Sequence, residues 1–156
     1  MKKMLLAIAG ILISGAGQAD VLSGSLWHVP EEIAQNAIPA NIPTTTPDVT
    51  FDVSPSLNFG TVNFGRENTV GTWLGSGGAF NIVEKTPGTL DSRMDTAMEG
   101  CSTDCRGLAS LLEFSGLVDV TSGQAFTVTH DDGVTLTIGG LNLGLNPGPL
   151  TLPLQL

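Results

Sequence analysis

The chain has 156 residues, 15 of them acidic and 6 basic, and its formal net charge is −9 at pH 7. This length predicts one domain, and the acidic balance excludes a protein that binds nucleic acid or an anionic membrane through Lys and Arg. The aromatic content of 5% argues against a stacking platform for bases, whereas the hydrophobic content of 41% argues against a disordered chain.

Residues 1–19 have the pattern of a signal peptide. Two lysines stand in residues 1–4, residues 5–15 are apolar apart from Ser14, and small residues occupy positions −3 and −1 of a cleavage site after Ala19. The apolar stretch is shorter than the ~20 residues that a membrane-spanning helix needs, and the alternative is a buried N-terminal helix. We therefore expect a mature chain that starts at Asp20, lies outside the cytoplasm as a secreted or cell-surface protein, and contains no membrane span.

Residues 20–48 are predicted to form a short helix and an extended connector. Pro30 suits the first position of a helix, and the two glutamates that follow it favour the positive end of the helix dipole. Apolar residues form a narrow stripe over 33–38, and Pro39 ends the helix. Residues 40–47 contain two more prolines and three threonines, which predicts extended backbone.

A β domain is predicted over residues 49–146. Within it, residues 49–53, 57–64 and 80–83 are candidate strands. The periodicity of residues 69–74 fits either a strand or a helical turn, and the sequence leaves these two alternatives open.

The only two cysteines of the chain are Cys101 and Cys105, in the polar segment 85–107, which we expect to be a long surface excursion. An oxidising compartment would allow them to form a disulfide, which would close a small loop and add roughly 2 kcal/mol of stability. Three residues separate them, so this is no Cys-x-x-Cys redox motif. A metal site is the alternative, and the lack of a nearby His argues against it.

Residues 110–138 show the clearest alternation in the chain. Leu112 and Phe114 alternate with Glu113 and Ser115, and the residues around positions 127 and 136 alternate in the same way. This period of two predicts three antiparallel strands, each with one buried face and one face in solvent.

The last hairpin of this region has a predictable register. A two-residue turn would mix apolar and polar side chains on each face, whereas a three-residue loop over 131–133 pairs Val128 with Leu136 and keeps apolar side chains together. Such loops end in a left-handed residue, a position that Gly133 suits. The preceding loop also ends in glycine, which favours a β-meander, and residues 141–146 allow one more edge strand.

The segment from Phe126 to Gly140 consists of an alternating run, the triplet Asp-Asp-Gly and a second alternating run. It resembles the central motif of PA14-like domains and their GLEYA relatives, which are β-sandwich modules of secreted and surface proteins, many of them glycan-binding. In the lectin-type members, the paired aspartates hold a calcium ion that contacts sugar hydroxyls. The resemblance implies that Asp131 and Asp132 bind calcium and glycan, with Gly133 as the turn residue.

A wider part of the chain, from residues 26–31 through residues 69–74 to this hairpin, resembles exported bacterial proteins with a C-terminal sorting signal. In that group a membrane helix and a basic tail follow, and in PA14-like domains further strands follow. This sequence instead ends in a Pro-rich tail, residues 147–156. The resemblance therefore implies an all-β fold, an antiparallel β-sandwich truncated at its C-terminus, with one short N-terminal helix.

Two aspartates are too few for calcium, which takes six to eight oxygen ligands. Asp119, Asn142, Asn146 or loop carbonyls would have to converge on the site. The alternative is that residues 131–133 are an ordinary solvated hairpin loop, for which Asp and Gly are common residues.

The sequence contains no Gly-x-Ser-x-Gly, His-Glu-x-x-His or EF-hand spacing, and we interpret His28 and His130 as packing residues. The prediction is an exported, non-enzymatic binding module, with calcium-dependent glycan binding at the Asp-Asp-Gly loop. The alternative is a structural protein of the cell envelope or extracellular matrix without a small ligand. A third hypothesis is a secreted hydrolase, because the two carboxylates of a glycosidase need not be close in sequence.

Overall fold

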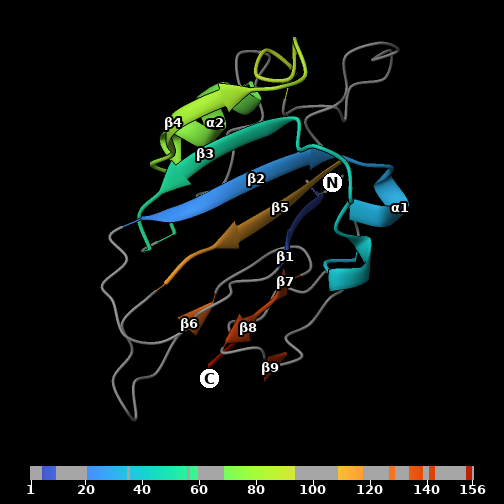
Figure 1. The fold of residues 1–156 in the computed structure, drawn as a ribbon, viewed down its shortest axis with the longest axis vertical. Coiled ribbons are helices and arrows are strands. Elements are labelled where there is room, and N and C mark those ends of the chain that lie inside the picture. The colour runs from blue at the N-terminus through green and yellow to red at the C-terminus, as the bar shows by residue number, and fades with distance from the viewer. Residues whose placement is uncertain are drawn as a thin grey trace.

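The computed structural model describes residues 5–9, 21–34, 36–55, 57–59, 69–93, 109–117, 127–128, 134–138, 141–142 and 154–155. Its centre is one sheet with the strand order β4-β3-β2-β5-β1-β7 (Figure 1). The strands of this sheet are β1 (Leu5–Ala9), β2 (Leu22–His28), β3 (Val49–Val53), β4 (Phe80–Glu84), β5 (Ala109–Ser115) and β7 (Val134–Thr135). The four strands β4, β3, β2 and β5 are antiparallel, whereas β1 is parallel to both β5 and β7.

The helices of the described residues are short, and so are the remaining strands. The helices are α1 (Glu31–Ala34), the 3₁₀ turn η1 (Pro39–Asn41) and α2 (Val70–Ser76). The other strands form two separate antiparallel pairs, β6 (Thr127–Val128) with β10 (Leu154–Gln155) and β8 (Thr137–Ile138) with β9 (Leu141–Asn142).

One face of the sheet holds the main hydrophobic core. Alternate residues of β2, β3 and β5 point to this face, because side chains that lie opposite each other in a ladder share a face. Thus Leu26 lies between Val49 and Leu112, and each of these three is at most 1% exposed. Helix α2 covers this face with its own buried side chains, Val70, Trp73 and Leu74.

Helix α2 begins and ends at identifiable caps. Thr69 accepts a hydrogen bond from the amide of Thr72, whose hydroxyl accepts one from the amide of Thr69, and this reciprocal pair forms a capping box. The amide of Val70 donates to the carbonyl of Ser92, which ties the turn after β4 to the start of the helix. The helix ends at Gly77.

The opposite face of the sheet has a smaller apolar cluster. Trp27 and Leu111 are cross-strand neighbours there, and Ala37 packs on them. The Trp27 indole Nε1 donates to the Thr45 carbonyl at 3.0 Å, so the connector after η1 crosses this end of the face. The positions of β2, β3 and β5 beyond this cluster on the same face are polar.

Several predictions from the sequence are confirmed. The described residues are mostly β, with four antiparallel strands in one sheet, and the strands at 49–53 and near 80–83 are present. A short helix follows Pro30, and the ambiguous residues 69–74 lie mainly in helix α2.

Other predictions are wrong. Residues 22–28 form a strand that we did not expect, and residues 57–59 belong to no strand. Residues 5–9 form a strand, so the alternative of an N-terminal helix is wrong for them. The predicted pairing of Val128 with Leu136 is also wrong, because Val128 pairs with Leu154 in a separate sheet.

Candidate functional site

The residues to which the sequence assigns chemistry lie outside the part of the chain that the structure describes. They are Asp131, Asp132 and Gly133 of the acidic loop and the cysteines Cys101 and Cys105. Calcium binding at the loop and a disulfide between the cysteines therefore stay predictions. The described strands on either side of the loop are β6 and β7, so the order strand, Asp-Asp-Gly, strand is present in the chain.

A serine, a histidine and an aspartate meet at one end of the sheet. Ser110 Oγ lies 3.3 Å from Nδ1 of His28, and the backbone amide of His28 donates to Oδ2 of Asp48 at 2.7 Å. These residue types match a hydrolytic triad, in which the carboxylate orients the imidazole through its second ring nitrogen. Here the carboxylate binds the main chain of the histidine, and the Ser110 side chain is 1% exposed. This geometry does not present a nucleophile to a substrate.

Asp48 has a structural role at the same end of the sheet. Its amide donates to the Leu26 carbonyl at 2.9 Å, and its own carbonyl accepts from the amides of Lys85 at 2.7 Å and Thr86 at 3.1 Å. With the bond to His28, Asp48 joins β2 to the start of β3 and the end of β4. His28 contributes its main chain to this junction, and the interpretation of its side chain as a packing residue stays a prediction.

Six polar side chains occupy the face of the sheet opposite the main core, and we call them the polar face. In the ladder, Ser25 lies between Thr50 and Glu113, and Ser23 lies between Asp52 and Ser115. Since opposed residues share a face, these two rows form one patch across β3, β2 and β5. The members of the polar face are Ser23, Ser25, Thr50, Asp52, Glu113 and Ser115.

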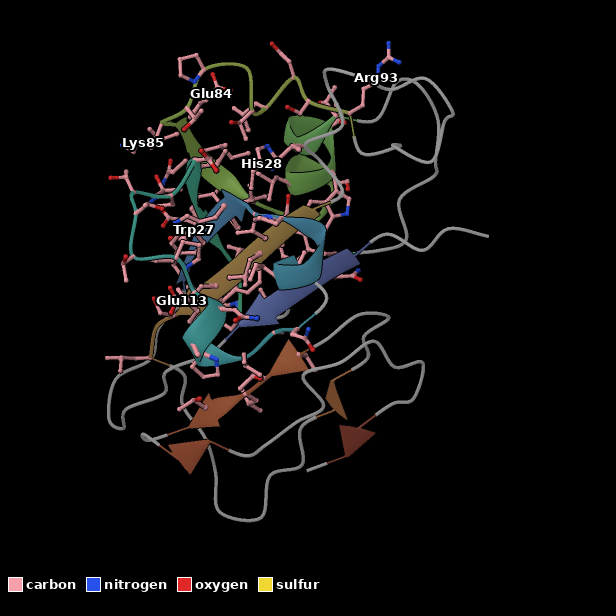
Figure 2. All side chains as sticks on the ribbon, turned by 90° about the vertical axis from the view of Figure 1, so that its right-hand side faces the viewer. Trp27, His28, Glu84, Lys85, Arg93 and Glu113 are labelled. Carbon is pink, nitrogen blue, oxygen red and sulfur yellow. The ribbon has the colours of Figure 1, made fainter. Side chains whose placement is uncertain are left out.

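The two carboxylates of the polar face have different surroundings. Asp52 accepts a hydrogen bond from Asn81 Nδ2 at 2.8 Å, and Asn81 adopts a positive φ of 50°. Glu113 is half-buried, and desolvation raises the pKa of its carboxyl above the usual glutamate value. Figure 2 shows Glu113 away from the end of the sheet where Glu84 and Lys85 lie.

The polar face combines hydroxyl donors with carboxylate acceptors, which is the chemistry that recognises hydroxyl-rich ligands. Within the described ranges, no group of three or more His, Cys, Asp or Glu is placed to hold a metal ion. The sequence predicted the outward side of β5, at Glu113 and Ser115. It missed Ser23 and Ser25, although their alternation with Leu22 and Leu26 carried the signal.

Comparison with protein-family models, with curated proteins and with solved structures gave no match to this chain. The likeness to PA14-like domains is therefore a resemblance of residues alone. Among the described helices, none is long and apolar enough to cross a membrane.

Proposed function

We propose that this chain is an exported, non-enzymatic binding module that holds calcium at Asp131 and Asp132 and uses it to bind an extracellular glycan. The observation that supports this proposal is the order along the chain of strand β6, the Asp-Asp-Gly triplet and strand β7, although β6 pairs with β10 and β7 with β1. The leader-like residues 1–19 support export.

Electrostatics favours a cation at the acidic loop. Two adjacent ionised carboxylates repel each other, and a divalent ion offsets this repulsion. Without residues 1–19, the chain would carry 15 acidic and 4 basic side chains, a net charge of −11 that further favours cations. Sugar hydroxyls and loop carbonyls would supply the oxygens that two aspartates cannot.

The experiment is a calorimetric calcium titration of the chain and of two variants. We expect saturable heat with a Kd of about 10⁻⁴ to 10⁻³ M, the range of extracellular calcium modules. The Asp131→Asn/Asp132→Asn variant should lose this heat. The matched control Asp91→Asn/Asp95→Asn removes the same charge in another segment and should keep it.

A glycan array, probed with and without a calcium chelator, then tests the ligand. Binding that disappears with the chelator and in the Asp131→Asn/Asp132→Asn variant supports the proposal. Equal calcium heats in all three proteins would contradict it and would favour a structural protein without a small ligand. N-terminal sequencing of the exported product tests the leader, and we expect it to begin at Asp20.

A further inference from the structure

Strand β1 occupies a position inside the sheet, between β5 and β7 (Figure 1). Residues Leu5–Ala9 lie in parallel register with Ala109–Glu113 over five residues, and the last two of them also pair with β7. The other side of β5 is filled by β2. Without β1, residues 109–113 of β5 would therefore lack a partner along one edge.

Contacts that do not involve β1 also connect β5 and β7, the strands on either side of it. The hydroxyl of Thr135 on β7 donates to the carbonyl of Ala37, and the fully buried side chain of Ala37 packs with Leu111 of β5. This chain of contacts ties β7 to the β5 layer through the connector after α1. If β1 were absent, these contacts would hold β7 near β5, and the space between the two strands would keep the width of one strand.

Without β1, two strand edges could accept an added strand: the outer edge of β4 and the edge of β5 that β1 occupies. These two edges differ in how well they are protected against strand addition. At β4, the register with β3 is irregular between Thr50 and Asp52, Asn81 has a positive φ, and the strand ends in the charged Glu84. Such features block pairing with another strand. The pairing of β5 with β1 is regular, and its central residues Leu111 and Leu112 are fully buried.

The same residues that form β1 lie within the predicted signal peptide, residues 1–19. Cleavage after Ala19 would remove β1 and leave the amides and carbonyls along one edge of β5 unsatisfied. An uncovered strand edge is a template for pairing with another chain, so another strand can take this place.

We propose that the edge of β5 is a strand-acceptor site that binds a short, uncharged, aliphatic peptide strand of another molecule in the place of Leu5–Ala9. The proposal rests on the export proposed above, since leader removal is what opens the site. The chemistry of the occupant follows from its surroundings. Leu111 and Leu112 favour aliphatic neighbours, and the half-buried Glu113 disfavours a second carboxylate beside it. Main-chain hydrogen bonds would supply the affinity, as in other cases of strand addition.

The test uses the full chain, produced without export, and the substitution Ala7→Pro. Proline in the middle of a strand removes a main-chain donor, so it should displace β1. Ala16→Pro is the matched control, because it lies in the same leader but outside β1. The probe is a synthetic peptide with the sequence of residues 4–10, and the readout is hydrogen exchange of the amides of residues 109–113.

We expect Ala7→Pro to speed exchange of these amides by about tenfold or more, while the amides of β2 and β3 keep their protection. Added peptide should restore the protection, and the same peptide with proline at position 7 should not. The control should behave like the unmodified chain. Unchanged exchange in Ala7→Pro, or no effect of the peptide, would overturn the proposal, because another segment would then close the edge.

A second variant, Ala9→Pro, keeps the test informative if Ala7→Pro does not fold. It disturbs only the end of β1, and faster exchange should be confined to residues 112–113. If both variants lose protection throughout the sheet, β1 is an integral strand and no separate acceptor site exists. Because neither calcium nor export takes part in this experiment, failure of the calcium titration or of N-terminal sequencing is distinguishable from failure here.

Discussion

Replacing Gly24 by alanine is the sharpest test of the main core. Gly24 lies on β2 opposite Phe51 of β3, and a Cβ at this position would lie 2.3 Å from Cε2 and 2.4 Å from Cζ of that ring. The ring of Phe51 is 3% exposed and makes edge-to-face contacts with Phe114 at 5.8 Å and Phe59 at 6.3 Å between centroids. These neighbours leave the ring little room to move away.

Overpacking of this kind costs about 1–3 kcal/mol, and we expect Gly24→Ala to lower the free energy of unfolding by about 2 kcal/mol. For a chain of this size, the expected fall in Tm is about 4–8 °C. Denaturant titration and thermal melts measure the two quantities.

Two further variants make the test specific. Phe51→Leu shortens the side chain that the new methyl group meets, so the cost of Gly24→Ala should be smaller in that background by roughly 1 kcal/mol. Gly75→Ala is the control, because a Cβ there meets nothing within 4 Å, and alanine raises helix propensity by up to about 1 kcal/mol. A Gly24→Ala protein as stable as the unmodified chain would refute the reasoning.

Three other predictions concern single polar groups. Asp48→Ala removes the acceptor of the His28 amide and should cost about 1–3 kcal/mol in a denaturant titration, whereas Asp48→Asn should cost less. Thr69→Ala removes the acceptor of the Thr72 amide at the start of α2 and should cost about 1 kcal/mol, measured in the same way. Desolvation raises the pKa of Glu113 in the folded chain, so ionisation weakens the fold as pH rises through the raised pKa. Glu113→Gln should therefore be more stable than the unmodified chain at neutral pH and equal to it below the usual glutamate pKa, and equal stability at neutral pH would contradict this.

The parts of the fold that the sequence predicted are those in which the local pattern is sufficient. Strand β3 was predicted from residues 49–53, where Val49, Phe51 and Val53 alternate with polar residues, and all three are buried. Strand β2 was missed because Gly24 interrupts its apolar series. The structure explains this glycine, because the Phe51 ring occupies the space that a side chain would fill.

The sequence did not allow us to predict which strands pair with each other. Alternation determines which face of a strand is buried, but it does not determine which strand lies beside it. We predicted that Val128 pairs with Leu136, eight residues further along the chain, but it pairs with Leu154 of β10. The polar face could not be predicted for the same reason. Glu113 could be assigned to an outward side of its strand, but its proximity to Ser25 depends on a pairing between segments far apart in the chain.

The strand order also determines the sequence in which this sheet can assemble. Strands β2, β3 and β4 follow one another along the chain and pair as neighbours, so they can associate as soon as residue 84 is available. The contact between His28 and Ser110 spans 82 residues, and closing so large a loop is entropically costly and slow. During synthesis or translocation, the three-stranded intermediate would present the bare side of β2 until the last third of the chain arrives. Chaperone binding and misassembly would both be concentrated at that stage.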